Sequence, residues 1–123
     1  MEYSIKHDVV GNYFVIETEG DFNLDHFGKL SDDLLSHNKW VPGTNCLFDY
    51  RKTSLFSMSN SDIANAAQMH IKSNSKIGNG KSAFVVMNIG NTGMSRMYEA
   101  STCVDTTFSH FIDIDKARKW LTD

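Results

Sequence analysis

The chain has 123 residues, of which 41% are hydrophobic and 22% charged, a composition that predicts one globular domain over residues 1–123 and excludes a disordered chain or a fibre. Its 12 Lys and Arg residues are outnumbered by 15 Asp and Glu residues, which gives a net charge of −3. Because nucleic-acid binding needs a basic face to neutralise phosphates, and the sequence has no basic cluster, this balance argues against a general nucleic-acid binder.

The sequence contains no segment typical of secretion or of membrane insertion. Residues 1–7 lack the basic start and apolar core of a signal peptide, and no run approaches the ~18 apolar residues of a membrane span. Cys46 and Cys103 are not spaced as a redox pair, and we interpret both as small core residues, with a disulfide as the alternative. We therefore expect a soluble, cytoplasmic protein.

The first third of the chain predicts a hairpin and a helix. Two β-type runs, residues 3–10 and 13–20, flank Gly11-Asn12, a pair that favours a tight turn. A helix is expected over residues 24–36, with Asn23 as its N-cap. Its apolar residues recur at helical spacing and make one stripe, formed by Leu24, Phe27, Leu34 and Leu35.

The rest of the chain alternates strands with helices. The expected elements are a buried strand over residues 45–51, a helix that starts with a Ser59 and Asp62 cap, a strand over 82–88, a helix opened by the turn at 90–93, a strand over 107–112 and a helix over 114–121. This order predicts a single mixed, mostly parallel five-stranded sheet with an antiparallel first strand, flanked by four helices. Edge strands of such a sheet invite pairing, so we also expect a homodimer.

Unusual polar residues follow the predicted strands at the place where open α/β sheets bind ligands, beyond the carboxyl ends of the strands. Asp49 and Arg51 end the central strand, and Asn91 and Thr92 lie in the turn after the next strand. Free N–H groups at the helix that follows, with Arg96 one turn in, predict a site for an anionic group. The alternative is an ordinary strand-to-helix turn capped by Thr92.

Asp49 has two further interpretations. A partly buried carboxylate beside Arg51 or Arg96 has a shifted pKa, which suits a general base or a switch acid. A structural ion pair perturbs a carboxylate in the same way without catalysis. The sequence leaves both open.

Methionine is frequent after the turn at 90–93. Met94 and Met97, with Tyr98 beside them, lie in the helix that this turn opens. Because Met adapts to varied apolar partners, these three residues predict a pocket or a docking surface, with plain core packing as the alternative.

No metal or cofactor site is expected. The five histidines show neither H-x-H nor H-E-x-x-H spacing, and the sequence has no G-x-S-x-G nucleophile elbow. Classical hydrolase chemistry is therefore unsupported.

Several segments resemble the SpoIIAA-like branch of the STAS superfamily, a group of small bacterial α/β proteins. The resemblance covers most of the chain after residue 12 and depends on the order and spacing of Trp40-Val41-Pro42-Gly43, Leu47-Phe48-Asp49-Tyr50-Arg51, Arg96-Met97-Tyr98-Glu99-Ala100, and an ending with Phe111-Ile112-Asp113, Ala117, Trp120 and Leu121. It implies the same mixed five-stranded sheet and a non-enzymatic role.

The resemblance also carries expectations about regulation and ligands. Better-known STAS relatives are anti-sigma-factor antagonists that are switched by phosphorylation of a serine in an Asp-Ser-x-Gly motif. The corresponding stretch here, residues 57–62, contains Ser59 and Ser61 but not that motif. The resemblance thus implies Ser59 and Ser61 as phosphorylation candidates. The branch is also similar in architecture to lipid-carrying CRAL-TRIO-type domains, which implies an apolar ligand.

Together these features predict a non-enzymatic binding or regulatory module. We expect it to engage a protein partner or a small ligand around Asp49, Arg51 and Arg96. One alternative is a carrier or sensor of an apolar, lipid-like ligand that uses the methionine-rich helix. The other is an enzyme with Asp49 as acid or base.

Overall fold

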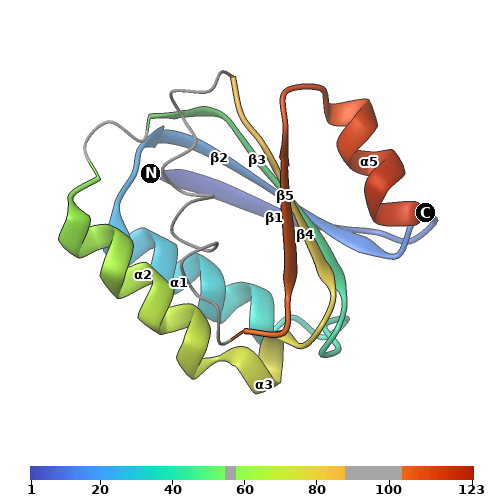
Figure 1. Cartoon of the computed structure of the whole chain (residues 1–123), viewed down its shortest axis with the longest axis horizontal. Helices are drawn as coiled ribbons and strands as arrows, with labels where there is room; N and C mark the ends of the chain where they lie inside the picture. Colours follow the sequence, from blue (N-terminus) through green and yellow to red (C-terminus); the bar gives the residue numbers. More distant parts are fainter. Residues whose placement is uncertain (55–57, 88–103) are drawn as a thin grey trace.

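A five-stranded β-sheet lies at the centre of the computed structural model, which describes residues 1–54, 58–87 and 104–123 (Figure 1). In chain order the strands are β1 (Glu2–Asp8), β2 (Tyr13–Asp21), β3 (Asn45–Ser54), β4 (Lys81–Val85) and β5 (Thr107–Phe111). Their spatial order is the same, with β1 antiparallel to β2 and all other neighbours parallel. The expected mixed sheet is confirmed.

Helices cover both faces of this sheet. α1 (Leu24–Leu35), α2 (Asn60–Lys72) and the short α3 (Asn74–Ile77) lie on one side, and α5 (Ile114–Thr122) lies on the other (Figure 1). The described part of the chain therefore holds four helices, of which α3 was not expected. The helix predicted after the turn at 90–93 lies outside the described residues.

Capping side chains set where the helices begin. Asn23 Oδ1 accepts a hydrogen bond from His26 N at 3.0 Å, as expected for the N-cap of α1. α2 starts with a capping box, in which Ser59 Oγ accepts from Asp62 N and an Asp62 carboxylate oxygen accepts from Ser59 N. Asp113 caps α5 with its carboxylate, which accepts hydrogen bonds from Asp115 N and Lys116 N.

Three strand boundaries differ from the expectation by two residues or more, and one of them is the end of β4, which lies at Val85 in place of residue 88. β1 ends at Asp8, whose carboxylate accepts a hydrogen bond from Gly11 N at 3.0 Å, and the two following valines turn out into solvent, 80% and 99% exposed. β3 continues past Arg51 to Ser54 because β2 runs beside it to the last residue. Asp49 and Arg51, which were expected to end this strand, therefore lie within β3.

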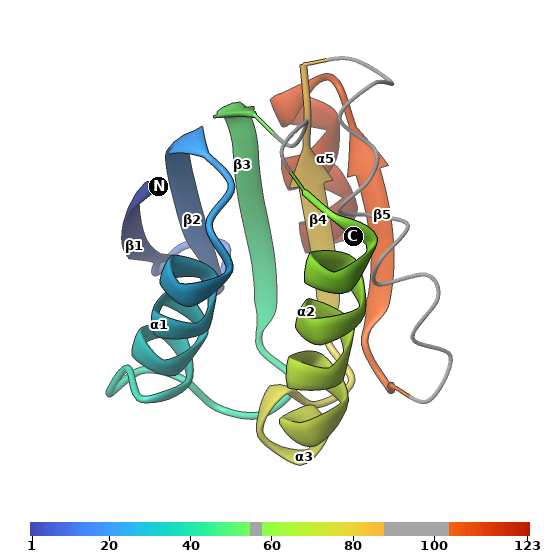
Figure 2. The same cartoon turned by 90° about the vertical axis from the view of Figure 1, so that its left-hand side faces the viewer.

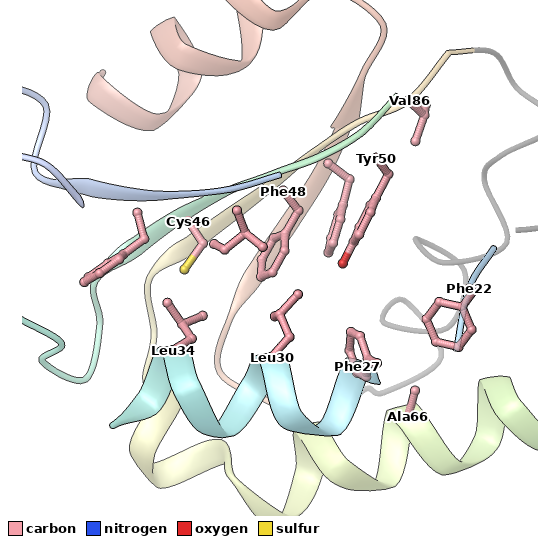
Figure 3. Close-up of a cluster of buried hydrophobic side chains, with 12 residues drawn as sticks. Phe22, Phe27, Leu30, Leu34, Cys46, Phe48, Tyr50, Ala66 and Val86 are labelled. Carbon is pink, nitrogen blue, oxygen red and sulfur yellow. The ribbon is translucent and has the colours of Figure 1, made fainter. Parts of the chain in front are cut away.

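Alternate strand residues point to opposite faces of the sheet, which creates two cores. The larger core lies under α1 and α2, where Phe27, Leu30 and Leu34 of α1 face Cys46, Phe48 and Tyr50 of β3 (Figure 3). The smaller core packs the other face against α5 through residues that include Val15, Leu47, Ala117 and Leu121.

Candidate functional site

Asp49 and Arg51 form an ion pair on the α5 side of the sheet. Arg51 Nε donates to Asp49 Oδ1 at 2.9 Å, Arg51 Nη2 donates to Asp49 Oδ2 at 2.7 Å, and the Arg51 backbone N–H reaches Oδ1 at 3.2 Å. Asp49 pairs in register with Glu17 of β2 and Val85 of β4, so it lies where β4 ends while β2 and β3 continue.

The pair keeps the Asp49 carboxylate ionised. Partial burial raises the pKa of this carboxyl, but the hydrogen bonds from the Arg51 side chain and backbone, with the charges of Arg51 and Lys52, outweigh burial and hold the pKa below its ordinary value. A general acid or base works best with a pKa near the operating pH. This geometry favours the structural ion pair over an acid or base at Asp49.

An open depression of about 660 Å³ surrounds this pair, and Glu17, Glu19 and Lys52 also line it. The other residues predicted for this surface, Asn91, Thr92 and Arg96, lie outside the described residues. Of that group, the described residues Asp49 and Arg51 lie together, and binding at this surface stays a prediction.

The remaining predicted site residues fall in two places. Met94, Met97 and Tyr98 lie outside the described residues. Ser59 and Ser61 are exposed at the start of α2, where the Ser59 hydroxyl already accepts the capping hydrogen bond described above. Their phosphorylation stays a prediction.

A cavity of about 280 Å³ lies on the other side of the sheet, between the sheet and helices α1 and α2. Its floor includes three stacked rings from neighbouring strands: Phe48 and Phe84 are 5.1 Å apart and Phe84 and Phe108 are 5.9 Å apart, measured between ring centroids. Leu30 of α1 and Met69 of α2 are among its walls. The lining is thus mainly apolar and strongly aromatic.

The mouth of the cavity lies between the two helices. Among the described lining residues, all are buried or partly buried except Asp32 on α1 and Lys72 on α2. These helices run side by side over the sheet (Figure 2). Charged groups are therefore found where the cavity meets solvent.

Inside the cavity the polar groups are neutral. The His70 side chain belongs to a residue that is 8% exposed, and its ring packs on Phe108 at 5.3 Å between centroids. Burial lowers the pKa of His70 to about 4, so the imidazole is uncharged at neutral pH. Burial likewise raises the pKa of the Cys46 thiol. Trp40 Nε1 donates to Lys76 O at 2.8 Å, which fixes the indole at the cavity wall.

Sequence patterns alone did not indicate this cavity, although small residues mark it. Gly28 lies in the middle of α1, and a methyl group added there would meet Met69 Cε at 3.5 Å, an ordinary contact distance. Ser82 is buried in β4 on the same face as Phe84. A filled core would carry larger side chains at these two positions. Their small size is the signal in the sequence that could have indicated the cavity.

The described residues contain neither a metal-ligand cluster nor a membrane-spanning helix. Among residues 1–54, 58–87 and 104–123, no three His, Cys, Asp or Glu side chains come together in a way that could hold a metal ion. In the same ranges no helix combines the length and apolarity needed to cross a bilayer.

Comparison with known proteins defines the fold. No family model and no curated protein matches the sequence. The structure is similar to that of an uncharacterized protein of the DUF3478 family with a SpoIIAA-like fold from Shewanella loihica PV-4, with a TM-score of 0.65, 15% sequence identity, and coverage of 98% of this chain and 92% of that chain. The chain therefore has a SpoIIAA-like fold, as the resemblance in its sequence implied. At this identity the likeness carries the fold alone.

Proposed function

We propose that this chain is a non-enzymatic binding module that holds a small, uncharged, apolar ligand in the cavity between α1, α2 and the sheet. The cavity itself carries the proposal, because ligand sites are concave, mostly apolar and few per protein. The proposal keeps the apolar ligand of the carrier alternative and rests on the described cavity residues instead of the methionine-rich segment.

The cavity volume bounds the size of the ligand. An apolar cavity of roughly 150 Å³ in another protein accommodates one benzene molecule. At about 280 Å³, this cavity suits a molecule of roughly two rings. The stacked floor of Phe48, Phe84 and Phe108 favours a flat, ring-containing ligand, since offset stacking adds to area burial.

The electrostatics of the lining favour an uncharged ligand. His70 is neutral at pH 7, and the charged lining residues, Asp32 and Lys72, lie at the exposed mouth. A charge carried into the cavity would lose its hydration without gaining a counter-charge from the described residues inside it, and such burial is strongly unfavourable. A charged analogue of a good ligand should therefore bind far more weakly.

A matched pair of fluorescent probes tests this proposal. 2-Naphthol has two rings and is neutral at pH 7, and 2-naphthalenesulfonate carries the same ring framework with a sulfonate in place of the hydroxyl. We expect the neutral probe to bind one site per chain and the anionic probe to bind at least tenfold more weakly. Equal binding of the two probes, or no saturable binding, would refute the proposal.

Two matched variants locate the site. Ser82→Ile places a larger apolar side chain in the cavity from β4 and should reduce binding of the neutral probe at least tenfold. Ser109→Ile makes the same change on β5, where Ser109 pairs with Ala83 on the α5 face, and should leave binding unchanged. If both variants bind like the wild type, the probe lies elsewhere. Native mass spectrometry of gently purified protein then shows whether a small molecule co-purifies.

A further inference from the structure

β1 is an edge strand whose outer side pairs with no other described strand. It ends the sheet order, and in the described part of the chain its neighbour is β2 alone. The strand has seven residues, without proline or a register shift against β2. Such an edge presents free backbone N–H and C=O groups to any second strand.

The charges of β1 complement one another in a single self-pairing register. If two copies of β1 pair antiparallel with Ser4 opposite Ser4, then Glu2 of each copy faces Lys6 of the other. Opposite charges on directly facing residues stabilise a strand pair, and like charges destabilise it. Within one chain, Glu2 instead faces Glu19 of β2, a like-charge pair that a lysine from a second copy would offset.

The other face of β1 fits the same register. Tyr3 and Ile5 are partly buried and pack against the core under α1. In the Ser4-centred pairing, Tyr3 of each copy faces Ile5 of the other, an aromatic and β-branched pair of the kind that stabilises sheets. The core would then continue from one copy to the next beneath a ten-stranded sheet.

We infer that the chain forms a two-fold symmetric homodimer through antiparallel β1–β1 pairing centred on Ser4. β5, the other edge of the sheet, does not offer this recognition, because its five residues include no Asp, Glu, Lys or Arg. An isologous interface of this type closes after two copies. The inference is independent of the cavity, which lies between α1, α2 and the sheet.

Charge exchange tests both the dimer and its register in the full chain. Sedimentation velocity at 10–200 µM in low salt should show the wild type as a dimer. Glu2→Lys alone places two lysines opposite each other, and Lys6→Glu alone places two glutamates opposite each other, so each variant should dissociate at least tenfold more readily. An equimolar mixture of the two variants restores both charge pairs in a heterodimer and should recover the dimer. The double variant Glu2→Lys/Lys6→Glu should also dimerise.

Each outcome decides the inference. Recovery of the dimer in the mixture supports this register and shows that both variants are folded. A wild type that stays monomeric over the whole range overturns the inference and leaves Glu2 and Lys6 as charges that protect the edge. Single variants that dimerise like the wild type, or a mixture that stays monomeric, overturn the register.

Discussion

Protonation of His70 should make folding stability depend on pH. Its pKa is about 4 in the folded chain, against an ordinary value of 6.5. Between these two pH values the unfolded chain binds a proton that the folded chain excludes, so stability falls as pH falls from about 6.5 to 4. At about 1.36 kcal/mol per pKa unit the full effect is about 3 kcal/mol. Residual solvent around the ring reduces our expectation to about 2 kcal/mol.

Urea unfolding at pH 7.0, 6.0, 5.0 and 4.5 measures this effect. His70→Leu keeps an apolar side chain against Phe108 and cannot take up the proton, so it should lose about 2 kcal/mol less than the wild type across this range. His110→Leu changes an exposed residue of β5 and should keep the dependence of the wild type. Parallel curves for the wild type and His70→Leu would refute the reasoning.

Three further predictions concern α1 and the Asp49 pair, each measured by urea unfolding. Gly28→Ala should raise the free energy of unfolding by about 0.5–1 kcal/mol, because Ala favours the helix and the added methyl group meets Met69 at 3.5 Å; a lower urea midpoint would contradict this. Asn23→Ala should lower the free energy of unfolding by about 1 kcal/mol through loss of the α1 cap. Asn23→Asp should retain most of the stability that the cap contributes. Asp49→Asn should cost at most about 1 kcal/mol at pH 7, because Arg51 is 39% exposed. That difference should vanish in acid, since a lowered pKa stabilises the fold only while the carboxylate is ionised. A cost of several kcal/mol would instead indicate an unpaired buried charge.

Most of the fold could be predicted because its signals are local. Asn23 and the capping box at Ser59 begin helices where expected, and the apolar runs become strands in the expected order. α3 was missed because it is one turn long and the glycines after it read as a loop. Gly78 has a positive φ of 83°, and a methyl group there would lie 2.3 Å from Gly43 N. Glycine is therefore required at residue 78 partly because of a turn that is distant in the sequence.

The candidate site was predicted less well because its features are non-local. The pairing of Asp49 with Arg51 follows from their i, i+2 spacing on one strand and could be anticipated as a structural pair. The length of β3, which places Asp49 inside the strand, depends on how far β2 runs beside it. The cavity depends on several elements at once: a missing side chain at Gly28 of α1 and a small one at Ser82 of β4 matter only because both elements line the same cavity with α2 and β3.

The cavity has a stability cost that can be measured directly. At about 24 cal/mol per Å³, an empty cavity of about 280 Å³ costs at most about 7 kcal/mol, comparable to the stability of a whole domain, and water at its mouth reduces that figure. Ser82→Ile fills part of the space and should raise the free energy of unfolding by about 1 kcal/mol while it removes probe binding. The free energy of unfolding of the wild type should rise by about 2.7 kcal/mol when the neutral probe is present at 100 times its Kd. A variant that is more stable but no longer binds would show that the cavity is maintained for a ligand at the expense of stability. A variant that is less stable and still binds would show that this part of the core is not the binding site.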